Sequence, residues 1–284
     1  MLKPGRCLLS CIAALLGAAP AAQLAAQKIA YTPVSQQVLE ERLKRGLGNN
    51  KAREAALRKL FEEAGCPEVA GQAPKGLSRP NLLCTLAGEE QATIVVGAHY
   101  DKVPQGEGII DDWGGAALLP SLFESLRRAP RRLTFLFAGF SGEEDGLLGS
   151  KAFVKLMNAE DKANVKAMID IDCLGLGPTK IDVQHADQRL VEAVARVADG
   201  TNLPIGVMNI GRVGMSDAAS FRQIGVPTLE FHSLTKETLP LINGFRDRAS
   251  ELRPSDYADS YRLIGSFLAF IDVTWGLPAA PAEQ

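Results

Sequence analysis

Three short segments of this 284-residue chain carry side chains that bind metal ions or transfer protons. They are His99 with Asp101, Asp111 with Asp112, and the acidic run at 143–145. Each segment alone has an ordinary structural explanation, because an aspartate before a helix can cap it and a charge run is usually a solvated loop. Their positions are more informative, since each lies where a predicted strand ends or a predicted helix begins.

The elements that must position these residues alternate between strands and helices. Nearly continuous apolar runs predict strands at 81–86, 93–98, 133–140, 167–171, 181–184 and 227–231. Helical patterns are found at 113–128, 150–157, 188–198, 216–223 and 255–275. This alternation predicts one α/β domain, a three-layer αβα sandwich around a mostly parallel, mixed sheet.

In such a sheet the carboxyl ends of parallel strands share one edge, where sites form. Predicted strands lead into His99, into 141–145 and into Asp172, so we expect imidazole and carboxylates to meet there. Carboxylates brought together need a cation, and oxygen donors combined with imidazole suit zinc. Asp101 is expected to accept the second ring N–H of His99. Asp111, at a helix entrance, is placed to be shared by two cations.

A polar helical segment precedes the sheet. Residues 34–64 predict a surface helix with one buried stripe, broken in two near Gly46 and Gly48. We therefore assign residues 27–78 to an N-terminal helical segment that packs on the main domain, and 79–276 to the main domain itself. The Pro- and Ala-rich end, 277–284, is expected to be frayed.

The first residues are typical of a secretory signal. Lys3 and Arg6 precede an apolar run at 7–16, and small residues at 19–26 offer cleavage sites. The run is too short to cross a bilayer as a helix, so no stable membrane span is expected. We predict a signal peptide at 1–26 and a periplasmic or secreted protein; a buried N-terminal helix is the alternative.

Composition and cysteine count restrict the remaining possibilities. Lys and Arg total 31 against 33 Asp and Glu, and aromatic residues make up 6%, which argues against nucleic acid as a partner. Removal of the signal would leave Cys66, Cys84 and Cys173. An oxidising compartment favours a bridge between Cys66, at a helix end, and Cys84, in a strand, with unpaired buried thiols as the alternative.

Taken together, the motifs resemble the M28 family of zinc aminopeptidases. The similarity is carried by Gly97-Ala98-His99-Tyr100-Asp101, 108–115, 142–150, 168–172, Ser216-Asp217 and 225–227, in this order. It extends over residues 80–272 and is highly specific as a combination. The family fold, a mixed sheet between helices, agrees with the alternation of strands and helices.

The resemblance implies a role for each motif residue. His99 and Asp172 would bind one zinc ion, and Glu144 would bind a second. Asp111 would bridge the two ions, and Glu143 would be the general base. It also implies a cis peptide bond after Asp111. The predicted catalytic residues are therefore Glu143 and, acting through His99, Asp101.

One expected zinc ligand departs from the family pattern. The family places a histidine in a later segment, here 243–248, where Arg246 stands instead. Arginine keeps its charge and has no lone pair for a cation. Because the chain has only three histidines, we expect His232, after the predicted strand 227–231, to complete the second site, and we interpret His185 as a surface residue. A core histidine hydrogen-bonded in place is the alternative for His232.

The resemblance implies a zinc metallopeptidase that removes N-terminal residues from peptides, with two zinc ions, the second less secure. One alternative is a glutaminyl cyclase-like acyltransferase, which shares the fold and is implied to hold a single zinc with the equivalents of Asp111, Glu144 and the late histidine. Another is a binding domain that has lost its metal. The intact His99, Asp172 and Glu143 favour the peptidase.

Overall fold

The computed structural model describes residues 31–210 and 214–275. The predicted signal peptide at 1–26 and the predicted frayed end at 277–284 lie outside these residues. Within the described ranges, no helix has the length and the apolar character needed to cross a membrane.

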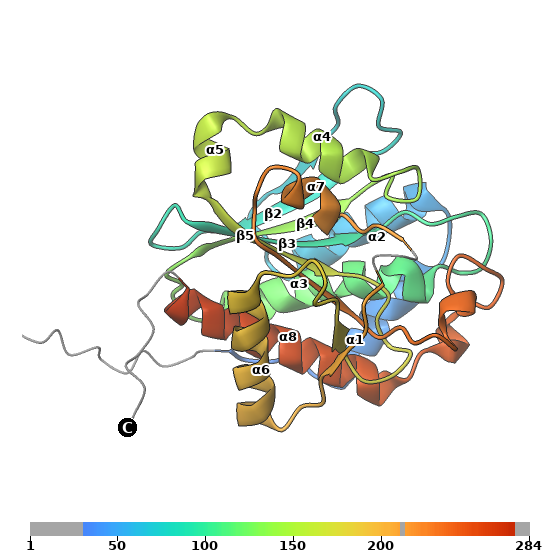
Figure 1. The fold of residues 1–284 in the computed structure, drawn as a ribbon. Helices are drawn as coiled ribbons and strands as arrows, with labels where there is room; N and C mark the ends of the chain where they lie inside the picture. Colours follow the sequence, from blue (N-terminus) through green and yellow to red (C-terminus); the bar gives the residue numbers. More distant parts are fainter. Residues whose placement is uncertain (1–30, 211–213, 276–284) are drawn as a thin grey trace, which may run out of the picture.

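One eight-stranded sheet forms the centre of the structure (Figure 1). Its strands are β1 (Val69–Gln72), β2 (Asn81–Leu86), β3 (Thr93–His99), β4 (Thr134–Phe140), β5 (Val165–Ile171), β6 (Lys180–Ile181), β7 (Gly206–Val207) and β8 (Thr228–His232). They lie in the order β1-β2-β4-β3-β5-β8-β6-β7. Strands β4, β3, β5 and β8 are parallel to their neighbours within this group, whereas β1, β2 and β6 introduce antiparallel pairs. The sheet is therefore mixed with a parallel centre, as predicted.

Helices cover both faces of the sheet, which gives the three predicted layers (Figure 1). One face carries α1 (Gln36–Leu43), α2 (Asn50–Glu63), α3 (Gly114–Leu126), α6 (Gln188–Thr201) and α8 (Pro254–Thr274). The other carries α4 (Leu148–Leu156), α5 (Ala159–Asn164) and α7 (Ala218–Arg222). Short helical turns at Lys44–Gly46, Leu239–Leu241 and Ala249–Glu251, and a kinked turn at Ile109–Trp113, lie between these elements.

The central strand β3 shows why its sequence is almost continuously apolar. Ile94 and Val96 pack in the core formed with α1, α2 and α3, whereas Val95 packs on the opposite face with Phe153 and Phe221. Successive side chains of a strand point to opposite faces, so a strand covered on both sides must be apolar at every position. All three β3 side chains are fully buried, which stabilises the fold by roughly 1.5–3 kcal/mol each.

The N-terminal helices share the core of the main domain. Leu57 and Phe61 of α2 are fully buried in the same cluster as the sheet residues. A disulfide joins Cys66, just after α2, to Cys84 in β2, which confirms the expected bridge, and Cys173 is buried and free. Closing a loop of this length stabilises by about 3 kcal/mol in the chain-entropy model.

Some small elements were not predicted, namely β1, β7 and α5, and β6 is shorter than the predicted strand at 181–184. Strand β1 is a short edge strand with no buried residue, and α5 also buries none of its residues. Helix α5 is instead defined by reciprocal capping between Asn158 and Asp161. Hydrophobic periodicity therefore could not identify these elements.

Candidate metal centre

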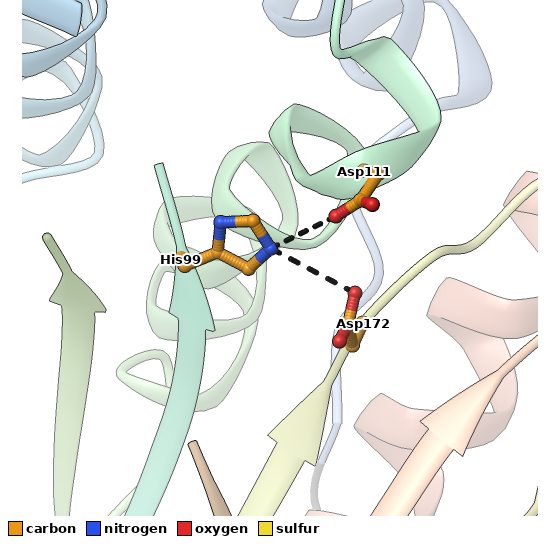
Figure 2. Close-up of side chains that lie close together, drawn as sticks. All are labelled: His99, Asp111 and Asp172. Atoms are coloured by element: carbon orange, nitrogen blue, oxygen red, sulfur yellow. Dashed lines mark hydrogen bonds and ion pairs between the residues drawn. The ribbon is translucent and has the colours of Figure 1, made fainter. Parts of the chain in front are cut away.

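Three of the predicted metal ligands meet at the carboxyl ends of β3 and β5. His99 is the last residue of β3, Asp172 follows β5, and Asp111 lies in the kinked turn Ile109–Trp113 before α3, where its own backbone is not helical. His99 Nε2 is 3.0 Å from Asp111 Oδ1 and 3.9 Å from Asp172 Oδ1. Figure 2 shows both carboxylates facing the same ring nitrogen. We call these three residues the metal-ligand trio.

The trio fits a zinc ion. One ligand atom from each residue lies within 4.8 Å of the others. Ligand atoms around a tetrahedral zinc at about 2.0–2.1 Å are separated by about 3.3 Å, which the two distances from His99 bracket. Asp172 Oδ1 is buried and has no hydrogen-bond partner, as expected of an atom reserved for a cation. Three protein ligands would leave one position open, which is typical of catalytic zinc.

The electrostatics of the trio also favour a cation. Burial, followed by the charge of Asp111, raises the pKa of Asp172 to about 7. The same two causes raise the pKa of Glu144 to about 7. Burial opposes protonation of His99, but the neighbouring Asp101 and Asp111 outweigh it and raise its pKa well above the usual value. The metal-free centre therefore holds protons that a bound metal must displace.

Asp101 connects the histidine to the acidic turn after β4. Its Oδ1 lies 3.6 Å from His99 Nδ1, an ion-pair distance that is too long for the hydrogen bond expected from the sequence. Its two carboxylate oxygens accept the backbone N–H groups of Glu143, at 3.2 Å, and Glu144, at 3.3 Å. Asp101 is thus a positioning residue, which fixes the two glutamates relative to the imidazole.

Glu143 and Glu144 lie in that turn without joining the trio. Glu144 Oε1 is buried and has no hydrogen-bond partner. Burial raises the pKa of Glu143 to about 9, with further contributions from Asp172 and Asp217. A carboxylate that gains a proton this readily beside a cation-binding centre is suited to take a proton from water, once a metal ion offsets part of the negative charge.

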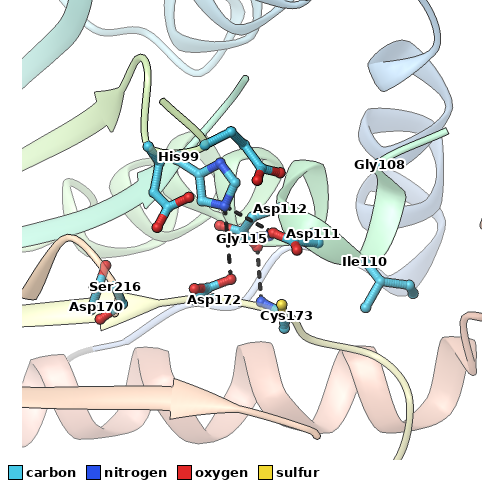
Figure 3. A network of polar contacts seen from close by, with 12 residues as sticks. His99, Gly108, Ile110, Asp111, Asp112, Gly115, Asp170, Asp172, Cys173 and Ser216 are labelled. Atoms are coloured by element: carbon cyan, nitrogen blue, oxygen red, sulfur yellow. Dashed lines mark hydrogen bonds and ion pairs between the residues drawn. The ribbon is translucent and has the colours of Figure 1, made fainter. Parts of the chain in front are cut away.

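Two further aspartates hold the turn that carries Asp111. Asp247 accepts the backbone N–H groups of Ile110 at 2.7 Å and Asp111 at 3.2 Å. The peptide bond between Asp111 and Asp112 is cis. Asp112 Oδ1 accepts the N–H of Cys173, the residue after Asp172, and so ties the two ligand segments together (Figure 3).

His232 is not part of this centre, which corrects the expectation that it completes a second metal site. It is fully buried at the end of β8, and its Nε2 donates to Met208 O at 2.8 Å. Its Nδ1 accepts the N–H of Leu234 at 3.1 Å. Burial lowers its pKa to about 4, so the ring is neutral. Because both nitrogens are bonded to the backbone, no lone pair is left for a metal ion.

Arg246, which stands where the family has a histidine, and His185, the third histidine, also lie away from this centre. The Arg246 side chain is 69% exposed and lies 3.8 Å from Glu251. His185 pairs with Asp182 at 3.6 Å near the surface. Across the described ranges, the trio is the one group of metal-ligating side chains close enough to hold an ion.

Curated proteins with similar sequences include aminopeptidases. A "Probable leucine aminopeptidase" of Arthroderma benhamiae is 26% identical over 66% of this chain. The chain spans less than two thirds of the length of several curated relatives that it matches, 57% in this case.

Solved structures show the same fold at low sequence identity. A zinc aminopeptidase from Bacillus subtilis has a TM-score of 0.61 at 19% identity, covering 67% of this chain and 49% of that chain. A glutaminyl cyclase from Fimbriiglobus ruber has a TM-score of 0.71 at 17% identity, covering 84% of this chain and 96% of that chain.

The family itself is established by sequence. Residues 81–263 match the description of Peptidase family M28. This range includes every residue of the trio, the acidic turn after β4 and both aspartates that hold the Asp111 turn. The chain therefore belongs to peptidase family M28.

Proposed function

We propose that this protein is a zinc-dependent aminopeptidase that hydrolyses the first peptide bond of peptide substrates. The observation that carries the proposal is the trio of His99, Asp111 and Asp172, set beside Glu143 at one edge of the sheet. Membership in family M28 and the aminopeptidase names of the curated relatives support it.

Each residue of the centre has a defined role in this reaction. A zinc ion bound there would supply Lewis acidity, which would polarise a carbonyl and lower the pKa of a water molecule to about 7. Glu143 takes the proton of the attacking water and delivers it to the leaving amine. Asp101 keeps Glu143 in place through its backbone N–H. His99, Asp111 and Asp172 would hold the metal.

We further propose that the trio is the tighter zinc site and that a second zinc, if bound, is held weakly. A second ion bridged by Asp111 would have Glu144 as its other ligand, and the described residues place no third side chain with them. His232 cannot supply the missing third ligand, because both of its ring nitrogens are hydrogen-bonded to the backbone. Zinc titration of the metal-free protein should show one tight site.

The activity is tested with metal-free and zinc-loaded protein on a panel of peptides. Zinc should restore release of free N-terminal amino acids, and an N-terminal glutaminyl peptide should be hydrolysed rather than cyclised. Cyclisation without release of an amino acid would instead assign the protein to the glutaminyl cyclases. Tight zinc binding with no turnover of either kind would favour a binding domain.

We also propose that the protein is exported. The signal-like residues 1–26 motivate this, and the disulfide between Cys66 and Cys84 supports an oxidising compartment. Mass measurement of the protein recovered from the host periplasm should give a chain shortened by about 21–26 residues, as expected of signal cleavage. An uncut chain in the cytosol would contradict export.

A further inference from the structure

A buried arginine of the N-terminal segment contacts both loops that carry metal ligands. Arg53 lies in the first turn of α2 and has no exposed surface. Helix α2 precedes residues 81–263, the part of the chain that matches the family. Arginine is almost never fully buried unless its charge and its N–H groups are satisfied, so this position requires an explanation.

All the acceptors of Arg53 are backbone carbonyl oxygens. Its Nε donates to Gly46 O at 3.0 Å. Its Nη1 donates to Tyr100 O at 3.3 Å and Asp101 O at 3.4 Å. Its Nη2 donates to Glu107 O and Gly108 O, each at 2.6 Å. A guanidinium group has five N–H donors in a rigid plane, and here each one has an acceptor.

These contacts connect the two loops that lie next to His99 and Asp111, two residues of the trio. Tyr100 and Asp101 directly follow His99 on the loop after β3, whereas Gly108 begins the turn that contains Asp111. One rigid guanidinium therefore sets the separation of the two loops. The guanidinium also lies 5.6 Å from the centre of the Trp113 ring, at the end of the same turn.

We propose that Arg53 is a positioning residue for the metal centre, which fixes the His99 loop against the Asp111 turn. The N-terminal helical segment is then a functional part of the centre and more than a cover for the sheet. This inference rests on the proposed zinc site, because it concerns the geometry of two of its three ligands.

A purely electrostatic role predicts the opposite result. Asp247, Asp112, Asp101 and Asp111 all act on Arg53 through their charges. Removing a positive charge from among these carboxylates would, by Coulomb's law alone, make zinc bind more tightly. Loss of a positioning group makes zinc bind more weakly, since the ligand atoms no longer converge. The direction of the change therefore separates the two roles.

The test measures zinc affinity of the full chain in three variants. Arg53→Met removes charge and donors, and Arg53→Lys keeps the charge but has at most three donors, without the planar arrangement. We expect the zinc Kd to rise in both, by about 10- to 100-fold, the range found when groups that orient metal ligands are lost. We also expect the visible absorption of the cobalt-substituted protein to change and kcat to fall more than KM rises.

Arg42→Met is the matched control. Arg42 is a buried arginine of the neighbouring helix α1, but it donates to Ser121 and Glu124 of α3 rather than to the ligand loops. Its loss should lower the unfolding temperature while the zinc Kd and the cobalt spectrum stay those of the wild type.

The outcomes separate this inference from the proposed function. Unchanged or tighter zinc binding in both Arg53 variants, with zinc bound by the wild type, overturns the positioning role alone. Failure of both variants to fold would make Arg53 a requirement of the fold and would also reject the inference. A wild-type protein that binds no zinc would overturn the proposed function, and the inference with it.

Discussion

Two buried histidines end parallel strands of the same sheet, yet their surroundings are opposite. His99 ends β3 and His232 ends β8. His99 Nε2 faces two carboxylates, whereas His232 has a backbone carbonyl at one nitrogen and a backbone N–H at the other. Nearby carboxylates raise the pKa of His99, and burial lowers that of His232 to about 4. A strand end thus places an imidazole at the correct edge, but its bonding partners decide whether it can bind a metal.

Replacement of the first histidine should have the largest effect. His99→Ala removes one of three protein ligands of the trio, so we expect loss of tight zinc binding and at least about a 1000-fold fall in kcat/KM, because the water is no longer acidified. Metal analysis and kinetics check this result. His185→Ala, at the surface histidine, is the control and should match the wild type. A His99→Ala protein that keeps both zinc and activity would show that His99 is not a metal ligand and would contradict the comparison with His232.

Replacement of Glu143 should separate catalysis from metal binding. Glu143→Gln cannot accept the proton of water, so kcat should fall by about 100-fold or more, the scale of general acid–base catalysis. Zinc content and unfolding temperature should change little, since Glu143 is not part of the trio. If the variant loses its zinc, the roles assigned to Glu143 and Glu144 are exchanged.

The pH dependence of zinc binding sharpens the contrast further. His99, Asp172 and Glu144 have raised pKa values in the metal-free protein, the last two about 7, so they hold protons near neutral pH. Zinc must displace these protons, and its affinity should therefore fall as pH decreases from 8 to 6, by about 10-fold per pH unit for each proton released. Calorimetry in buffers of different ionisation enthalpy would count the protons. A pH-independent affinity with no proton release would contradict this account.

Replacement of the second histidine should affect stability without affecting zinc. His232→Ala leaves the half-buried Met208 O and the buried Leu234 N without their partner, and an unpaired buried group costs about 1–3 kcal/mol. Denaturant unfolding should show the loss, and zinc titration should give the wild-type Kd and stoichiometry. A weaker or missing zinc site in this variant would restore His232 as a ligand.

The sequence predicted the parts of the fold that depend on buried apolar runs. Strand β3 was predicted within one residue, because a strand buried on both faces leaves a continuous apolar signal. Strand β2 was predicted to the residue from its apolar run, although one of its faces is partly exposed. The three residues of the trio were predicted as metal ligands from their positions at the ends of strands or the start of a helix, together with the family motifs. His99 and Asp172 lie at the carboxyl ends of adjacent strands, where side chains share one edge.

The residues that were missed act through the backbone, which leaves little trace in a sequence. Asp247 stands next to Arg246 in the segment 243–248. The family pattern drew attention to this segment, but it did not predict the hydrogen bonds of Asp247 to the Asp111 turn. From the sequence, Arg53 is one of many charged residues on a predicted surface helix, although in the structure it is fully buried. The bonds of His232 to Met208 and Leu234 likewise depend on tertiary placement.

The most direct test of the central claim is the position of zinc in a crystal of the zinc-loaded protein, found by anomalous scattering at the zinc absorption edge. The trio predicts one strong peak within coordination distance of His99 Nε2 and of carboxylate oxygens of Asp111 and Asp172, with no peak at the His232 ring. A strong peak at His232, or a strong zinc peak away from all three trio residues, would contradict the account.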